Sequence, residues 1–233
     1  SMIINKFTDL PLIAPLQFAL KEIGYEVPTP IQAKAIPLLL EGKDLLGIAQ
    51  TGTGKTAAFS LPIIQRMDAH TTRPKPLTPR VLVLSPTREL TIQIHESFET
   101  YAKHTRVKAA VIFGGVGQGA QVTALKAGPD ILVATPGRLM DLYEQRFIKF
   151  DQIEVFVLDE ADQMLERGFL ADVKRILLLL PKKRQNLFFS ATMPKEIQDL
   201  AGTILDRPEK VEITPPARTA EKVEQFVYYV DKD

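Results

Sequence analysis

Six short apolar runs, each followed at once by a polar or glycine-bearing cluster, constrain the fold of this chain more than any other feature. The runs occupy residues 45–49, 81–84, 111–113, 131–134, 155–158 and 187–189. They are too short and too uniformly apolar for amphipathic helices, so we predict buried parallel strands. Stretches with helical spacing alternate with them, at 56–67, 89–103 and 169–180. The sequence therefore predicts an α/β fold whose mostly parallel central sheet is flanked by helices on both faces.

The clusters that follow the runs predict where the chain binds its ligands. Parallel strands bring their carboxyl ends to one edge of a sheet, and open α/β sheets bind ligands at that edge. We therefore expect one edge to carry the chemistry. The clusters are Gln50-Thr51-Gly52, Ser85-Pro86-Thr87-Arg88, Gly114-Gly115, Thr135-Pro136-Gly137-Arg138, Asp159-Glu160 and Ser190-Ala191-Thr192.

Other segments lie outside this alternation. Residues 12–23 and 30–40 have helical spacing, and Thr29 followed by Pro30 is a good start signal for the second helix. Residues 71–79 hold three prolines and predict an exposed loop. Two consecutive prolines at 215–216 predict the end of the compact unit, so we expect one domain over residues 2–216.

Charge and composition narrow the functional classes. Lys and Arg number 29 against 28 Asp and Glu, so a surface for nucleic acid must be a local patch. The absence of cysteine excludes disulfides and thiolate chemistry. No apolar run approaches the roughly 18 residues of a membrane helix. We therefore expect no membrane association and a cytoplasmic location.

Residues 49–56 have the pattern of a phosphate-binding loop. In such a loop backbone N–H groups surround a phosphate tail, a lysine reaches the β- and γ-phosphates, and a hydroxyl reaches Mg²⁺. Ala49 replaces the first glycine of the usual pattern and is small enough for the turn to form. A glycine turn with a surface lysine is the alternative, which the flanking strand and helix disfavour. The predicted nucleotide site comprises Gln50, Thr51, Gly52, Thr53, Gly54, Lys55 and Thr56.

Two carboxylates follow the apolar run at 155–158 and complete the predicted catalytic set. A carboxylate directly after a buried strand faces the ligand edge, which separates this pair from acidic pairs on solvated helices. In phosphoryl transfer one acid holds Mg²⁺ and another positions water. We assign Asp159, together with Thr56, to the metal and Glu160 to the water, beside Lys55 on the phosphates.

With these motifs in place the chain resembles the DEAD-box family of ATP-dependent RNA helicases, whose namesake is Asp159-Glu160-Ala161-Asp162. The resemblance covers the chain after Ser1 and is nearest to the bacterial RhlE-like group. It implies a RecA-like three-layer fold, with ATP and Mg²⁺ as cofactors and RNA as partner. Residues 24–32 resemble the family's Q motif. The alternative interpretation of these residues is an ordinary capped helix with a core tyrosine.

The resemblance assigns further residues. The Q motif implies adenine recognition by Gln32 and Tyr25, with Phe7 as the upstream aromatic. Coupling of the nucleotide state to strand separation is implied for Ser190 and Thr192, through hydroxyl contacts to Asp162, although Ser190 and Thr192 could simply cap a helix. Contacts to the RNA phosphate and sugar backbone are implied for Pro86, Thr87, Arg88, Gly114, Gly115, Thr135, Pro136, Gly137 and Arg138.

The resemblance therefore implies the ATP-binding lobe of a helicase that couples ATP hydrolysis to RNA binding and local unwinding. Residues 217–233 would form a linker and the start of a second RecA-like lobe. Without that lobe we expect a monomeric fragment that binds adenine nucleotide and has little ATPase or helicase activity. One alternative is a nucleotide-gated module that clamps RNA or protein. A GTPase or small-molecule kinase is disfavoured, because no Asn-Lys-x-Asp guanine signature follows the loop.

Overall fold

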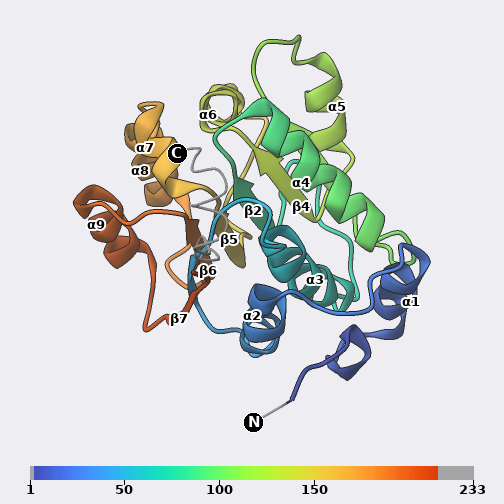
Figure 1. Cartoon of the computed structure of the whole chain (residues 1–233). Helices are drawn as coiled ribbons and strands as arrows, with labels where there is room; N and C mark the ends of the chain where they lie inside the picture. Colours follow the sequence, from blue (N-terminus) through green and yellow to red (C-terminus); the bar gives the residue numbers. More distant parts are fainter. Residues whose placement is uncertain (1–2, 215–233) are drawn as a thin grey trace, which may run out of the picture.

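The computed structural model describes residues 3–214 and places helices on both faces of one central sheet (Figure 1). All six strand pairings are parallel, in the order β3-β4-β2-β5-β6-β1-β7. This confirms the predicted architecture. The strands are β1 (Leu45–Ile48), β2 (Val81–Leu84), β3 (Ala109–Ile112), β4 (Ile131–Ala134), β5 (Val155–Leu158), β6 (Gln185–Ser190) and β7 (Glu209–Glu212).

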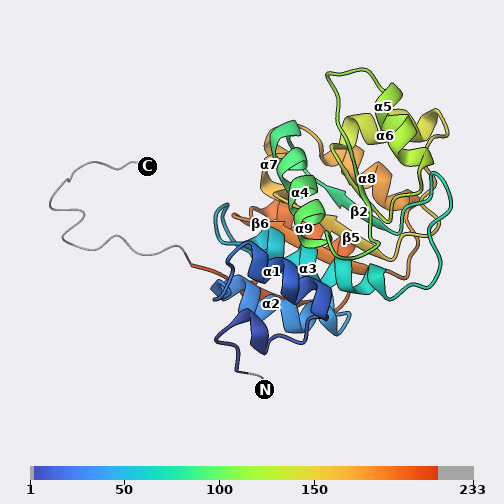
Figure 2. The ribbon, with the colours of Figure 1, turned by 90° about the vertical axis from the view of Figure 1, so that its right-hand side faces the viewer.

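The helices divide between the two faces of the sheet. Helices α7, α8 and α9 lie on one side of the strands, and α3 and α4 lie on the other (Figure 1). Helices α1 and α2 lie at the opposite end of the molecule from α5 and α6 (Figure 2). The helical elements are η1 (Phe7–Asp9), α1 (Ala14–Glu22), α2 (Pro30–Leu40), α3 (Lys55–Asp68), α4 (Arg88–Tyr101), α5 (Gly119–Lys126), α6 (Pro136–Glu144), α7 (Ala161–Glu166), α8 (Leu170–Leu179) and α9 (Lys195–Ile204).

Each central strand supplies side chains to two hydrophobic cores. Val81 and Val83 of β2 belong to one core, whereas Leu82 and Leu84 belong to the other, because successive side chains of a strand point to opposite faces. Phe59 of α3 packs in the first core. Burial on both faces explains why these strands read as continuous apolar runs.

One strand, β7, was not predicted from the sequence. Strand β7 pairs with β1 at the edge of the sheet, and Val211 is its one buried residue. An edge strand that is buried at one position carries no apolar run, so its sequence gives little signal. Strand β3 begins at Ala109, two residues before the predicted run. The predicted linker at 217–233 lies outside the described residues.

The register of the sheet brings the predicted ligand clusters to one edge. Leu84 pairs with Ala134 on one side and with Leu158 on the other, and Ile48 pairs with Ser190. Because Leu158 also pairs with Phe188, Ile48 and Ser190 lie two residues farther along this edge than Leu84, Ala134 and Leu158. None of the helices described, from residue 3 to residue 214, is long and apolar enough to cross a membrane.

Candidate functional site

The predicted phosphate loop is the connection between β1 and α3. Gly52 and Gly54 adopt left-handed backbone conformations, with φ of 89° and 86°, which glycine tolerates without steric cost. A Cβ on Gly54 would lie 2.5 Å from Nε2 of Gln32 and 2.8 Å from Oγ1 of Thr29. Helix α2 thus packs directly on the loop. Lys55 and Thr56 open α3, so the N–H groups of its first turn face the carboxyl edge of the sheet.

Lys55 contacts both acidic residues that were assigned to the catalytic site. Its Nζ lies 2.9 Å from Oδ1 of Asp159 and 3.5 Å from Oε2 of Glu160. The hydroxyl of Thr51 donates a hydrogen bond of 3.1 Å to the same Glu160 oxygen. The phosphate loop and the acidic pair are therefore in direct contact at the carboxyl ends of β1 and β5.

Burial controls the electrostatics of this contact. The Asp159 side chain is fully buried, and neither of its carboxylate oxygens has a partner in hydrogen-bonding geometry, although Lys55 is at ion-pair distance. Burial raises the pKa of Asp159, and the Lys55 ammonium offsets only part of that rise. Burial also disfavours the charged form of Lys55, but the attraction of Asp159 and Glu160 outweighs it and raises the Lys55 pKa.

Glu160 occupies a strained backbone position between β5 and α7. Its φ is 52°, in the left-handed region that a non-glycine residue rarely adopts. Such strain persists where the surrounding structure imposes it, and it concentrates at functional sites. The geometry directs the Glu160 side chain, whose exposed fraction is 18%, to Thr51 and Lys55.

The structure brings together the three residues assigned to coupling. Thr192 donates from its hydroxyl and its backbone N–H to Oδ2 of Asp162, at 2.9 and 3.1 Å. The Ser190 hydroxyl accepts from the Asp162 N–H at 3.1 Å and donates to the Thr192 carbonyl at 2.7 Å. The start of α7, directly after Glu160, is thus tied to the loop that follows β6.

Of the residues assigned to the base, Gln32 contacts the phosphate loop, whereas Phe7 and Tyr25 pack against each other beside α1. The rings of Phe7 and Tyr25 stack with centroids 6.2 Å apart; Phe7 is buried, whereas Tyr25 is 44% exposed. Gln32 is buried, accepts from the Thr29 N–H at 2.9 Å and donates to the Gly54 carbonyl at 3.0 Å. Its amide retains one N–H and further acceptor capacity.

The two arginines assigned to RNA are held by the loop after β3 and by Gln121 of α5. The Arg88 guanidinium lies 4.8 Å from the centroid of the Phe113 ring. Arg138 donates to the Val116 carbonyl at 2.7 Å and to Oε1 of Gln121 at 3.1 Å. Sequence reasoning did not find these three partners. A single glutamine on a helix, or a single phenylalanine or valine on a loop, has no motif that could have revealed it.

The remaining predicted RNA residues lie around these arginines. Gly115, with φ of 84°, and Gly114 are exposed in the same loop, and a Cβ on Gly115 would lie 4.0 Å from Arg88. The Thr87 hydroxyl caps α4 by accepting from the Leu90 N–H at 3.1 Å. Thr135, Pro136 and Gly137 begin α6 beside them.

Comparison with known proteins identifies the family. A model of the DEAD/DEAH box helicase family matches residues 29–200. The chain belongs to this family. Three relatives named as ATP-dependent RNA helicases illustrate the match. The ATP-dependent RNA helicase DeaD of Escherichia coli (strain K12) is 44% identical over 96% of the chain. CshA of Limosilactobacillus reuteri is 47% identical over 97%, and RhlB of Shewanella piezotolerans is 42% identical over 97%.

The chain spans 35%, 44% and 52% of the lengths of these three relatives. Among solved structures, a DEAD box protein from the hyperthermophile Methanococcus jannaschii superposes with a TM-score of 0.81 at 36% identity. The match covers 89% of this chain and 55% of that one. It confirms the predicted RecA-like fold of this DEAD-box chain, whereas the nearness to the RhlE-like group stays a prediction.

Proposed function

We propose that the chain is the ATP-binding lobe of an RNA helicase, extending over residues 2–216. The observation that carries the proposal is the contact of Lys55 with Asp159 and Glu160, 2.9 and 3.5 Å away. It joins a phosphate-type loop to two carboxylates at the ligand edge of the sheet. Phosphoryl transfer needs these groups in one place, because its catalysis is mostly positioning and charge stabilisation.

In the proposed ATP complex Lys55 exchanges its carboxylate partners for the β- and γ-phosphates. Thr56 and Asp159 would hold Mg²⁺, in part through water. Asp159 fits this task because both of its oxygens are buried without a hydrogen-bond partner, and a hard cation prefers such oxygen ligands. When bound, Mg²⁺ supplies positive charge that neutralises the phosphates. No group of three or more His, Cys, Asp or Glu side chains that could hold a metal ion occurs among residues 3–214.

Glu160 is the residue that we assign to the attacking water. Its carboxylate reaches the phosphate loop through Thr51 and Lys55, so it would lie beside a bound terminal phosphate. There it would accept a hydrogen bond from the water that attacks the γ-phosphorus, while the bond to the β-phosphate oxygen breaks. The products are ADP and inorganic phosphate.

Adenine and RNA would bind on either side of this centre. The half-exposed Tyr25 ring offers a face for the base, and the remaining donor and acceptor capacity of Gln32 matches the adenine edge. Arg88 and Arg138, with the loop glycines, would contact phosphates and sugars without reading base sequence. A second lobe, as expected from the longer relatives, would add positive charge that stabilises the transition state of hydrolysis. We propose that ATP turnover is slow in this chain alone.

Calorimetric titration with ADP and with GDP tests the nucleotide assignment. The wild-type chain and the surface control Lys34→Ala should bind ADP and prefer it to GDP, whereas Lys55→Ala should bind ADP weakly. A preference for GDP would remove the adenine assignment. An unwinding assay on a chain with both lobes then distinguishes a helicase from a nucleotide-gated RNA clamp, which would bind RNA with ATP and leave the duplex intact.

A further inference from the structure

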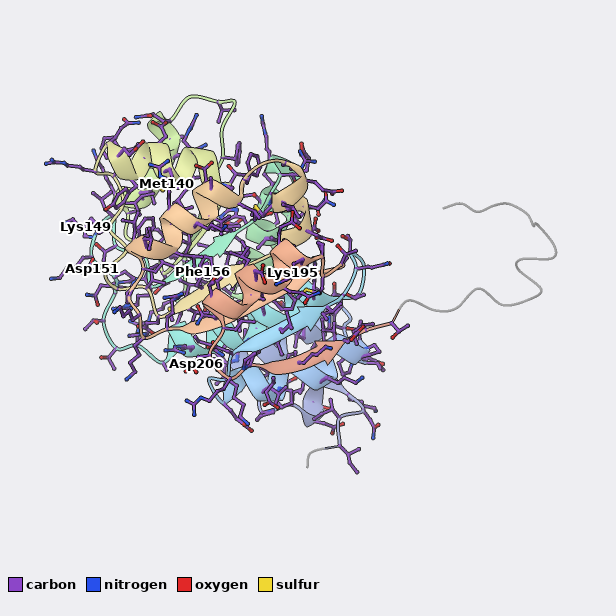
Figure 3. All side chains as sticks on the ribbon, turned by 90° about the vertical axis from the view of Figure 1, so that its left-hand side faces the viewer. Met140, Lys149, Asp151, Phe156, Lys195 and Asp206 are labelled. Carbon is purple, nitrogen blue, oxygen red and sulfur yellow. The ribbon has the colours of Figure 1, made fainter. Side chains whose placement is uncertain are left out.

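A cationic hollow of about 500 Å³ lies at the amino-terminal edge of the sheet, opposite the proposed ATP site. It is formed by the proline-containing loop before β2 and by the segment before β5. Lys149 and Asp151, on its rim, lie at one end of the molecule, and Lys195, which follows β6, lies toward the other (Figure 3). The charged lining consists of Arg73, Lys75, Arg80, Lys149 and Asp151.

The loop at this edge is anchored at several points. Arg73 pairs with the buried Asp130 at 2.8 Å and donates to the carbonyl oxygen of Arg106 at 3.0 Å. The Lys149 N–H donates to the Leu77 carbonyl at 2.8 Å, which joins the two segments of the hollow. The loop was predicted to be exposed, but these contacts hold it on the body of the protein. Its cations are therefore presented from a fixed framework.

The charge of the hollow is only partly compensated. Lys75 and Lys149 are exposed and form no ion pair within the part of the chain that the structure describes. Arg80 donates to the carbonyl and hydroxyl oxygens of Thr72 at 3.0 and 3.3 Å, and its guanidinium retains further N–H donors. Asp151 is the one acid in the lining. With Arg73 paired to Asp130, the other three cations of the lining against one carboxylate still attract an anion.

The chemistry of the lining favours phosphate groups. Lysine, arginine and threonine donors match phosphate oxygens, and no aromatic ring lines the hollow in the described residues to stack a base. Helix α6 starts at the proposed RNA edge and its nine residues, about 14 Å of helix, lead toward Lys149. A single strand that leaves the RNA edge along α6 can therefore reach the hollow.

We propose that this hollow is a second RNA contact, which binds the phosphates of a strand extending beyond the motif-lined edge. The proposal rests on the RNA-binding function proposed above. It concerns backbone phosphates, so it should increase affinity for long single strands without adding sequence preference.

Fluorescence anisotropy with labelled oligouridylates of about 6 and 20 nucleotides, at several salt concentrations, tests the proposal. Lys75→Ala/Lys149→Ala removes the two unpaired cations. Lys34→Ala/Lys210→Ala removes equal charge near the β7 edge, and Arg138→Ala weakens the motif-lined edge. Thermal melting checks that each variant folds.

For the Lys75→Ala/Lys149→Ala variant we expect roughly tenfold weaker binding of the longer strand and a salt slope shallower by about 1.4. Binding of the shorter strand should change less, and the Lys34→Ala/Lys210→Ala control should match wild type. Arg138→Ala should weaken the binding of both strands. If it does, equal salt slopes and affinities for the wild type and the Lys75→Ala/Lys149→Ala variant would overturn this inference and leave the proposed RNA function standing. Absence of RNA binding by the wild type would overturn both the inference and the proposed RNA function.

Discussion

The ammonium group of Lys55 lies 2.9 Å from the fully buried carboxylate of Asp159, although the two residues come from different strand-to-helix connections. This pair holds the phosphate loop against the acidic motif. An ion pair at this depth is sensitive to the loss of one member, because the remaining charge is left without compensation.

Lys55→Ala should weaken ATP binding by about 1.5 to 3 kcal/mol, roughly 10- to 150-fold in Kd, because charge-assisted hydrogen bonds to the phosphates are lost. Titration calorimetry with ADP and a non-hydrolysable ATP analogue measures the change. The loss should be greater for the analogue, since its extra phosphate lies within reach of the lysine. Equal losses for both ligands would contradict the assignment of Lys55 to the γ-phosphate.

The same substitution should make stability depend on pH. Burial already raises the Asp159 pKa, and without the Lys55 ammonium the pKa should rise further. A carboxyl whose folded-state pKa is raised stabilises the fold fully below its unfolded-state pKa of about 4, and this contribution is lost as pH rises through the folded value.

The stability deficit of Lys55→Ala relative to wild type should therefore grow as pH rises above about 4. Urea unfolding at several pH values measures it, with Lys34→Ala as the exposed-lysine control. A deficit that is constant over this range would show that Asp159 does not respond to Lys55.

Gly54→Ala should abolish nucleotide binding through a steric conflict with helix α2. Its Cβ would lie 2.5 Å from Nε2 of Gln32, and its φ of 86° is unfavourable for alanine. Gly42→Ala is a matched control, since Gly42 has φ of 83° and nothing within 4 Å of an added Cβ.

Both variants should lose about 1 to 2 kcal/mol of stability from the left-handed backbone, and Gly54→Ala should lose more. ADP titration and thermal unfolding measure the two effects. Normal ADP binding by Gly54→Ala would show that the packing of Gln32 on the loop is dispensable.

Thr192→Val should separate ATP binding from RNA stimulation. It removes the 2.9 Å hydrogen bond from the hydroxyl to Asp162 and keeps the backbone N–H contact at 3.1 Å. In a chain with both lobes we expect unchanged nucleotide affinity and a several-fold loss of RNA-stimulated ATP turnover. Thr203→Val, on α9, is the control, because its hydroxyl only donates to the carbonyl of Leu200 within the helix. Equal stimulation in Thr192→Val and wild type would argue for a capping role alone.

Local sequence pattern determined the sheet and its ligand edge. The run at 81–84 is apolar on both faces because both faces of β2 are buried, and the cluster that follows it had to lie at the carboxyl end of a parallel strand. The same reasoning placed Lys55 and Asp159 at one edge. It missed β7, where burial of Val211 alone leaves no apolar pattern.

Tertiary structure decided which of these residues touch. The sequence did not specify that Thr51 and Lys55 share one oxygen of Glu160, that Gln32 holds the Gly54 carbonyl, or that Lys75 and Lys149 border one hollow. Such contacts join segments up to 109 residues apart. They depend on the order and register of the strands, which long-range pairing and side-chain packing select, whereas hydrophobic periodicity reports only whether each segment is buried.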